Sequence, residues 1–360
     1  MIRTWTVDRP DEGVLGWLVV DTLRDGLAFG GTRFAPDLTQ AEVTGLARCM
    51  TWKLAAHGLP TGGAKAGLAV DPTDPDLPRK LAVFADGLRE PLTHCAVIGK
   101  DLGATNEMLD AVYRRLGLAQ LHLVRSRTPA CPPRLRDLPG YRTAMTGQGI
   151  AWATRALLGP AALTGARVAI QGAGVVGIGA ARRLEELGAT TVAISDAAGG
   201  RLVSGGVRWT DLADAAPQGR LGRLPGATDA AREAILHAPC DILVLAARSH
   251  SVDARLSAGI QARTVVEGAN FGLTEDARVA LHARGVTVLP DVLANSAAAA
   301  MTTRQLAAGG QLDDTSLWTA IEDAITRAVH RARGRVRDVG GTLRAASLHA
   351  AEAAGAWSVP

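Results

Sequence analysis

The chain has 360 residues, of which 47% are hydrophobic and 21% charged, with a formal net charge of +4. This composition is typical of a folded globular protein and excludes a disordered chain, while the length favours two domains. The basic residues are scattered apart from "RARGRVR" at 331–337, which we interpret as a solvated helix end, and no apolar run is long enough to span a membrane. We therefore expect neither nucleic acid nor a membrane as a partner.

The four cysteines lie far apart in the sequence, and none of them forms a CxxC pair. This spacing argues against a disulfide framework and a zinc site, so no metal is expected. The N-terminal stretch "MIRTWTVDRPDEG" has no apolar run behind its charges. Together these features predict a cytoplasmic protein.

The first part of the chain mixes strand and helix patterns. Apolar runs within 14–31 predict strands, whereas the spacing of apolar residues predicts helices over 38–57, 79–92 and 105–118. The proline-dense stretch 125–140 cannot continue a helix or a central strand, so we expect a domain boundary near residue 145. Residues 1–140 are thus predicted to form an α/β substrate domain.

Strands and helices then alternate regularly over 145–314. The apolar segments "RVAIQG", "TTVAISD", "DILVLAA", "TVVEGAN" and "VTVLPD" are separated by helical segments, the first of which is 175–187. This alternation predicts a doubly wound parallel sheet with both faces covered. The last segment, 315–360, reads as helices that we expect to pack back on the first domain, with one apolar face formed by Leu317, Trp318, Ile321, Ile325, Ala328 and Val329.

A dinucleotide-binding fingerprint opens the second domain. Gly172, Gly174 and Gly177 follow directly on a predicted strand and begin a predicted helix, and Asp196 ends the next strand. In a Rossmann-type fold these glycines permit a tight turn, close approach to a pyrophosphate and close packing of helix on sheet. The acid would bind the ribose 2′-hydroxyl and favours NAD, although the neighbouring Ser195 and Arg201 leave NADP open.

Lysine is scarce in this chain, with four lysines (Lys53, Lys65, Lys80 and Lys100) against 35 arginines. Arginine stays charged, whereas burial or a neighbouring cation can make a lysine neutral and therefore basic. A nicotinamide enzyme needs a cation that anchors its substrate and a group that moves protons. Lys65, in "GLPTGGAKAGLAVDP", and Lys53, twelve positions earlier, are the candidates.

Several spaced motifs carry a resemblance to a known family. "FGGTRFAPDLTQAEVTGLARCMTWKLAAHGLPTGGAKAGLAVDP", "GKDLGATNEM", "TGQGI", "GAGVVG", "VVEGAN" and "LPDVLAN" occur in the order seen in the glutamate, leucine, phenylalanine and valine dehydrogenases. The chain resembles that family from about residue 26 to 300. The resemblance implies an active site between two domains, a homo-oligomer, and NAD(P)-dependent interconversion of an L-amino acid with its 2-oxo acid and ammonia.

The resemblance also implies roles for individual residues. Lys53 would bind the substrate α-carboxylate, Lys65 would be the general base that activates water, and Asp101 would exchange a proton with the amino group. Gly30 and Gly31 would line the substrate pocket, and Asn270 and Asn295 would lie close to the nicotinamide end of the cleft. Further cofactor contacts are expected at Thr146, Val175, Val176, Ala247 and Asn270.

Phe29 provides information on the side chain of the substrate. In the glutamate branch of the family a lysine stands directly before the glycine pair, and this chain has Phe29 there. A buried carboxylate without a cation is costly, so we expect an apolar or aromatic amino acid as substrate, unless Phe29 belongs to the core. The length is similar to that of the leucine and phenylalanine branch, whereas "GGTRFAP" and "ISDAAGG" resemble the glutamate branch.

Three departures from the family pattern keep alternatives open. "SAAAAM" follows Asn295 in place of a glycine pair, "LAARSHS" places Arg248 and His250 after a strand, and Lys100 stands beside Asp101. One alternative is a dehydrogenase of specialised metabolism that acts on a non-proteinogenic amino acid or an imine. Another is a non-catalytic nucleotide-binding homologue, although a protein without catalytic activity would have no reason to keep Lys53, Lys65 and Asp101. A 2-hydroxy acid dehydrogenase is disfavoured by the lack of an arginine and histidine pair in motif context.

Overall fold

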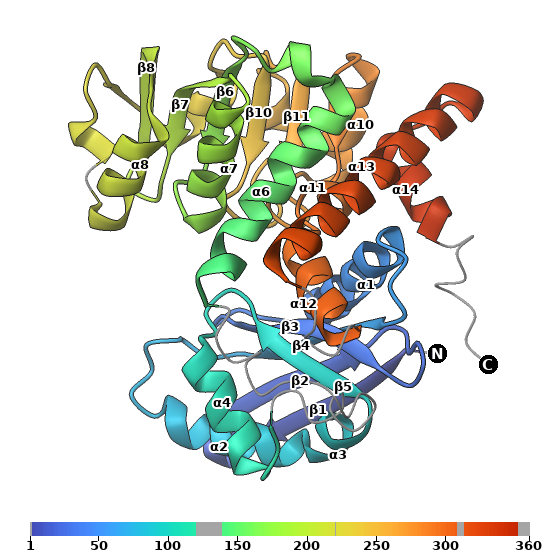
Figure 1. Cartoon of the computed structure of the whole chain (residues 1–360). Helices are drawn as coiled ribbons and strands as arrows, with labels where there is room; N and C mark the ends of the chain where they lie inside the picture. The colour runs from blue at the N-terminus through green and yellow to red at the C-terminus, as the bar shows by residue number, and fades with distance from the viewer. Residues whose placement is uncertain (1, 120–138, 220, 308–312, 352–360) are drawn as a thin grey trace. The chain divides into compact units, whose positions relative to one another are not determined.

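The computed structural model describes residues 2–119, 139–219, 221–307 and 313–351, which belong to two compact units (Figure 1). The first unit comprises residues 1–135, 302–317 and 351–360, and the second comprises 136–301 and 318–350. Each unit is built around one β-sheet.

The first unit contains a mixed five-stranded sheet in the order β1-β2-β4-β3-β5. Its strands are β1 (Arg3–Arg9), β2 (Val14–Val20), β3 (Ala28–Phe34), β4 (Gly62–Leu68) and β5 (Ala96–Lys100). The β1 and β2 strands are antiparallel, as are β2 and β4, whereas β3 runs parallel to both β4 and β5. Strand β4 carries the lysine that the sequence singled out, and the acid directly follows β5.

Helices cover both faces of this sheet (Figure 1). One face carries α1 (Gln40–Ala56), which begins after Thr39 because the Thr39 side chain accepts a hydrogen bond from the Glu42 amide. The other face carries α2 (Leu77–Gly87), α3 (Arg89–His94) and α4 (Asn106–Arg115), and a short 3₁₀ helix, η1 (Pro10–Glu12), joins β1 to β2. The larger core lies on the α2 to α4 side and includes Phe34, Phe84, Leu92, Ile98 and Leu109, all of them fully buried.

The α1 helix approaches β4 unusually closely, and Gly63 makes this possible. A Cβ atom at Gly63 would lie 2.2 Å from the Thr51 main-chain nitrogen and 2.7 Å from the Ala47 carbonyl oxygen. A polar cluster lies beside this contact. The side chains of Thr51 and Arg48, both on α1, donate hydrogen bonds to the buried carboxylate of Asp21, at 2.6 and 2.5 Å. The main chains of helix and strand are therefore held nearly in contact.

The second unit contains a seven-stranded sheet in the order β12-β11-β10-β6-β7-β8-β9. Its strands are β6 (Arg167–Gln171), β7 (Thr190–Ser195), β8 (Gly200–Val207), β9 (Thr228–Ala230), β10 (Ile242–Leu245), β11 (Thr264–Glu267) and β12 (Thr287–Leu289). Strands β12, β11, β10, β6 and β7 are parallel, and β8 and β9 are antiparallel additions at one edge. Strand order reverses beside β6, and in such sheets ligands bind outside the carboxyl ends of the strands at this switch point.

The helices of the second unit include α6 and α7, which cross one face of the sheet (Figure 1). The α-helices are α6 (Pro139–Leu158), α7 (Val175–Glu186), α8 (Trp209–Ala215), α9 (Ala254–Ser257), α10 (Glu275–Ala283), α11 (Asp291–Ala294) and α14 (Leu343–Ala351). The 3₁₀ helices are η3 (Pro160–Ala162), η4 (Ala216–Gln218), η5 (Leu221–Arg223) and η6 (Arg232–His237). Two more helices, α12 (Ala297–Ala307) and α13 (Asp314–Val339), each run from one unit into the other.

The structure confirms an α/β fold with a doubly wound sheet, and every strand expected from the apolar segments after residue 145 is present. Strands β8 and β9 were not predicted, because their residues show no continuous apolar run. The 331–337 stretch ends α13 with its arginine side chains exposed, as expected. The proline-dense stretch falls mostly on 120–138, outside the described residues.

The expected packing of the C-terminal helices on the first domain is wrong for residues 318–350, which belong to the second unit. Trp318 of α13 makes an edge contact with Trp152 of α6, with ring centroids 5.7 Å apart. Arg155 of α6 also forms an ion pair with Glu322 of α13. The apolar face of α13 was predicted correctly, but its partner is α6. In the part of the chain that the structure describes, no helix is both long and apolar enough to cross a membrane.

Gly63 and Gly45 give a matched test of the contact between α1 and β4. Gly63→Ala should destabilise the protein by about 2 kcal/mol or more, because the added methyl group meets main-chain atoms that cannot move independently. Gly45→Ala lies within α1 with nothing inside 4 Å of the added Cβ, so it should stabilise the protein by about 0.5–1 kcal/mol. Chemical denaturation of both variants measures this, and equal effects would contradict the close contact.

Candidate active site

Lys65 lies in the middle of β4 with only 3% of its surface exposed. Its Nζ donates a hydrogen bond to Oδ2 of Asp101, which directly follows β5. Lys65 is two residues from Gly63, so alternation along the strand places both on the sheet face that α1 covers. The structure thus brings together the lysine and the acid that the sequence singled out.

Arg33 of β3 joins this pair, although the sequence analysis did not single it out. Its Nη2 lies 3.4 Å from Oδ2 of Asp101, and its Nη1 donates to Oε1 of Glu42 at 2.6 Å. Arg33 stands two residues after Gly31, and this period-2 spacing on a predicted strand was the signal that would have found it. Lys65, Asp101, Arg33 and Glu42 form a chain of alternating charges, which we call the Lys65 cluster.

The Lys65 cluster perturbs the titration of its members. Burial lowers the pKa of Lys65 most, the Asp101 charge opposes this shift, and the charges of Arg33 and Lys53 lower the pKa further. Burial alone would raise the pKa of Asp101, but the charges of Lys65 and Arg33 outweigh it and hold that pKa well below its usual range. A carboxylate therefore persists beside an amine that gives up its proton more readily than an ordinary lysine.

Gly30 and Gly31 have different surroundings. A Cβ atom at Gly31 would lie 2.9 Å from the Asp101 Cβ and 3.2 Å from the Lys65 Nζ, so the absence of a side chain leaves room for this ion pair. A Cβ atom at Gly30 would lie 1.6 Å from the Ala64 carbonyl oxygen of the neighbouring strand. Gly31 thus borders the Lys65 cluster, and Gly30 borders main chain.

Lys53 and Phe29 are both nearly buried. Lys53 lies on α1 with 5% exposure, and its charge acts on Lys65. Phe29 lies on β3 with 7% exposure, and its position two residues before Gly31 places it on the face shared with Lys65. A Cβ atom at Gly99 of β5 would lie 3.6 Å from the edge of the Phe29 ring.

Lys100 acts away from the Lys65 cluster. It ends β5 and is half-buried. The pKa of Glu107 is lowered chiefly by its own backbone N–H and by Thr105, and the charge of Lys100 adds to that effect. The electrostatic partner that the structure gives Lys100 is therefore on α4.

The dinucleotide fingerprint forms a turn between β6 and α7 at the switch point of the second sheet. Gly172 has φ +104°, and a Cβ there would lie 2.8 Å from the main chain of Ala246 and Ala247, which follow β10. A Cβ at Gly177 would lie 1.9 Å from the Gly172 carbonyl oxygen, whereas Gly174 has nothing within 4 Å. The open main chain at Gly174 and the amino end of α7 fit a dinucleotide pyrophosphate.

Asp196 directly follows β7, and hydrogen bonds within the turn that begins there fix its carboxylate. Its Oδ1 accepts hydrogen bonds from the amides of Ala198 (2.8 Å) and Gly199 (3.0 Å). Arg201 of β8 pairs with Ile194, two residues before Asp196, and makes a 3.2 Å ion pair with Asp229. The fixed carboxylate fits a ribose with a free 2′-hydroxyl.

Asn295 and Asn270 contact each other. The Asn295 Nδ2 donates to Oδ1 of Asn270 and to the Gly268 carbonyl, both at 3.0 Å, while the buried Oδ1 of Asn295 has no partner among the described residues. In the segment after Asn295, the Cβ of Ala297 lies 2.5 Å from where a Cβ on Gly149 would stand. Gly149 of α6 therefore accommodates one of the two methyl groups that replace the expected glycine pair.

The remaining expected cofactor residues lie around the same sheet edge or on α6. Val175 and Val176 begin α7, with Val175 56% exposed, and Ala247 is exposed beyond β10. Thr146 is half-buried on α6. Among the described residues, no group of three or more histidine, cysteine, aspartate or glutamate side chains is arranged to hold a metal ion.

A doubly wound sheet with an open glycine turn, together with a buried lysine of lowered pKa in a separate unit, defines a dehydrogenase of the α/β class. The family model described as "Glutamate/Leucine/Phenylalanine/Valine dehydrogenase" matches residues 140–354, and the model of its "dimerisation domain" matches residues 4–116. The chain belongs to this family. It is accordingly an NAD(P)-dependent amino acid dehydrogenase that acts on a CH–NH₂ group.

Similar proteins include two glutamate dehydrogenases. The chain is 29% identical over 330 residues to the NADP-specific glutamate dehydrogenase of Saccharolobus shibatae, covering 87% of this chain and 76% of that protein. It is 33% identical over 303 residues to the glutamate dehydrogenase of Aeropyrum pernix, covering 80% and 70%. A hetero-hexameric glutamate dehydrogenase from Thermus thermophilus, solved with leucine bound, matches with a TM-score of 0.84 and 28% identity over 100% of this chain and 90% of that one.

Removing the charge of Arg33 should raise the pKa of Lys65. The guanidinium disfavours the ammonium form of Lys65, so Arg33→Met should stabilise that form, whereas Arg33→Lys keeps a positive charge and should change the pKa less. Because the chain has only four lysines, ¹³C NMR of labelled lysine side chains can follow the titration directly. A Lys65 pKa that is unchanged in Arg33→Met would contradict the coupling.

Asp196→Asn tests the cofactor preference. The asparagine keeps an oxygen that accepts from the Ala198 and Gly199 amides but removes the negative charge that repels a 2′-phosphate. We expect the affinity for NADPH relative to NADH to rise by about tenfold, which corresponds to about 1.4 kcal/mol. Fluorescence titration of both cofactors measures the ratio, and an unchanged ratio would show that Asp196 does not face the ribose.

Proposed function

We propose that the protein catalyses NAD(P)-dependent oxidative deamination of an L-amino acid with an apolar or aromatic side chain, or the reverse reductive amination. In this proposal Lys65 is the general base, Asp101 exchanges a proton with the amino group, and Lys53 binds the α-carboxylate. Gly31 leaves the space in which the reacting carbon approaches Lys65 and Asp101. The membership of the chain in the amino acid dehydrogenase family supports the reaction type.

Phe29 is the observation that carries the choice of substrate. It is an apolar side chain on the sheet face that bears Lys65, in the strand position directly before Gly30 and Gly31. Among the strand residues that share this face, Lys65 and Arg33 are the cations, and both already contact Asp101. A carboxylate at the end of a substrate side chain next to Phe29 would lose its hydration without gaining a counter-charge, which costs several kcal/mol.

The proposed chemistry follows from the charges of the Lys65 cluster. Bound NAD or NADP supplies the acceptor for the hydride that leaves the substrate Cα. Loss of that hydride leaves an iminium carbon, and neutral Lys65 takes a proton from a water molecule whose oxygen bonds to this carbon. Asp101, which has taken the proton that the substrate ammonium group loses before hydride transfer, returns it to the amino nitrogen of the resulting carbinolamine. The C–N bond then breaks, the hydroxyl oxygen forms the carbonyl as its proton passes to Asp101, ammonia departs, and Lys65 gives its proton to solvent. Burial and Arg33, which lower the pKa of Lys65, favour the neutral amine that the water step needs.

The alternatives differ in substrate or in chemistry. Glutamate is the substrate in the names of the relatives, and a non-proteinogenic amino acid or imine is the other enzymatic alternative. A non-catalytic nucleotide-binding homologue is disfavoured by the Lys65 cluster itself, because a buried lysine kept at a lowered pKa weakens the fold and has no use without proton transfer.

We also propose that the chain forms a homo-oligomer in the cytoplasm. The match of residues 4–116 to the family's dimerisation domain supports self-association, and a hetero-hexameric relative shows that unlike subunits are the competing possibility. The wide spacing of the four cysteines in the sequence suits a reducing compartment.

Lys65→Arg tests the general base. Arginine keeps the positive charge but does not deprotonate, so kcat should fall by at least about 100-fold, the lower range for loss of a general base. Lys80→Arg is the matched control, because Lys80 makes a surface ion pair with Asp74 and should keep normal turnover. NADH absorbance follows the rate, and near-normal turnover of Lys65→Arg at neutral pH would overturn the assignment.

Phe29→Lys tests the substrate assignment. The new cation should raise kcat/KM for acidic relative to apolar amino acids, whereas Phe29→Met should retain the apolar preference. If Phe29 belongs only to the core, both variants lose thermal stability and neither changes the preference. Steady-state kinetics with a panel of L-amino acids, run beside thermal melts, separates the two results.

A further inference from the structure

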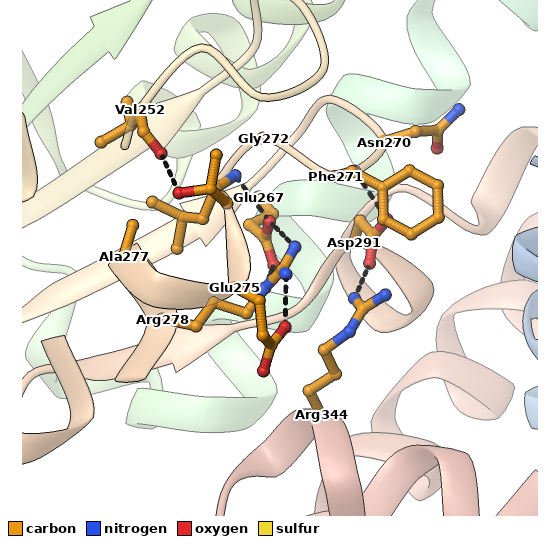
Figure 2. A network of polar contacts seen from close by, with 12 residues as sticks. Val252, Glu267, Asn270, Phe271, Gly272, Glu275, Ala277, Arg278, Asp291 and Arg344 are labelled. Carbon is orange, nitrogen blue, oxygen red and sulfur yellow. Dashed lines mark hydrogen bonds and ion pairs between the residues drawn. The ribbon is translucent and has the colours of Figure 1, made fainter. Parts of the chain in front are cut away.

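The loop between β11 and α10 carries Asn270 and has a strained residue beside it. Phe271 adopts φ +50°, a left-handed conformation that is uncommon for a bulky side chain. Such a conformation persists only where surrounding contacts hold it. The structure shows which residues make these contacts (Figure 2).

Asp291 at the start of α11 is one of the residues that hold the strained Phe271, and His250 is another, since its amide donates to the Phe271 carbonyl at 2.6 Å. Asp291 is fully buried, and its Oδ2 accepts a hydrogen bond from the Phe271 amide at 2.9 Å. Its Oδ1 accepts from the Val292 amide at 2.9 Å and from Nη1 of Arg344 at 2.5 Å. Arg344 reaches Asp291 from α14, and its guanidinium also lies over the Phe271 ring, 5.4 Å from the ring centroid (Figure 2).

The same helix holds the neighbouring residue of the loop. Asn295, one turn after Asp291, donates from Nδ2 to Oδ1 of Asn270. The α11 segment therefore contacts two consecutive loop residues, Phe271 through a carboxylate and Asn270 through a carboxamide. The two loop residues are consecutive, so a change in how Asp291 holds Phe271 would also displace Asn270.

A second buried acid makes the charge of Arg344 necessary. Glu267 at the end of β11 is fully buried and pairs with Arg278 at 2.7 Å. Burial raises the pKa of Glu267 most, and the charge of Asp291 raises it further, so the two carboxylates repel each other. Arg278 compensates Glu267 and Arg344 compensates Asp291, so each buried acid has a positively charged partner.

We propose that Arg344 and Asp291 are a positioning pair that sets the Asn270 carboxamide for the nicotinamide end of the cofactor. This inference rests on the proposed role of Asn270 as a cofactor contact. Arg344 touches neither cofactor nor substrate and acts through Asp291 and the Phe271 main chain. The C-terminal helix α14 thereby contributes to cofactor recognition.

Two ligands distinguish positioning from general stability. NADH carries the nicotinamide, whereas ADP-ribose has the same adenosine and pyrophosphate without it. Calorimetric titration of the full-length Arg344→Met protein should show an affinity for NADH that is lower by about tenfold, the scale found for residues that orient a ligand-binding group. Its affinity for ADP-ribose should stay within a factor of two of the wild type. Arg344→Lys keeps the positive charge but has no planar group to lie over the Phe271 ring. Its affinity for NADH should therefore lie between those of Arg344→Met and the wild type.

Arg155→Met is the matched control, because it also removes an arginine that pairs with an acid between two helices of this unit, and its partner Glu322 does not belong to the loop. It should leave both affinities unchanged. If Arg344→Met folds poorly, the double variant Arg344→Met, Asp291→Asn removes both buried charges together and should show the same selective loss of NADH affinity. Equal losses for NADH and ADP-ribose, or no loss for either, would overturn the proposal. Because binding requires no amino acid, this result is independent of which substrate the enzyme uses.

Discussion

The burial of the Lys65 ammonium is the constraint on which the first unit depends. A cation with 3% exposure must be compensated, and Asp101, which follows β5, supplies the counter-charge, while Arg33 of the intervening strand β3 contacts Asp101 in turn. Glu42 on α1 then balances Arg33, so helix and sheet are joined by charge as well as by packing. The main-chain contact at Gly63 brings α1 near enough for this. The arrangement that lowers the pKa of Lys65 is thus also the one that joins α1 to the sheet by charge.

The second unit uses buried charge in a related way. Glu267 and Asp291 are fully buried acids, each compensated by an arginine from a helix, and both lie against the loop that carries Asn270. Removing one partner of a buried pair is far more disruptive than removing both, because the remaining charge has no water around it. Geometry at the carboxyl edge of the parallel sheet is therefore specified by residues on α10, α11 and α14 rather than by the glycine turn alone.

Much of the fold was predictable from local patterns. Continuous apolar runs predicted β6, β7, β10, β11 and β12, and the three glycines predicted the turn before α7, because both signals lie within short stretches of sequence. Strands β8 and β9 were missed since they are antiparallel, short or glycine-rich, and carry no comparable run. The apolar face of α13 was predicted, yet nothing in its periodicity could specify Trp152 as its partner.

The residues of the candidate site also differ in whether the sequence could predict them. Lys65 and Asp101 were found because residue type and motif pointed to them, whereas Arg33 and Glu42 join them across separations of 68 and nine residues that no spacing rule connects. The Asp291 and Arg344 contact spans 53 residues and two helices, and it was missed for the same reason. Pairing between charges that are distant in the sequence depends on tertiary packing, which cannot be deduced from a single sequence.

The most direct test of the account is the substrate preference of the wild-type enzyme. Initial rates of NADH and NADPH formation should be measured across aliphatic, aromatic and acidic L-amino acids, with the reverse reaction from each 2-oxo acid and ammonia. We predict that kcat/KM for an apolar or aromatic amino acid exceeds that for glutamate by at least about tenfold, the ratio that about 1.4 kcal/mol of differential binding gives. A preference for glutamate would contradict it and would show that the enzyme solvates or pairs a second substrate carboxylate despite Phe29.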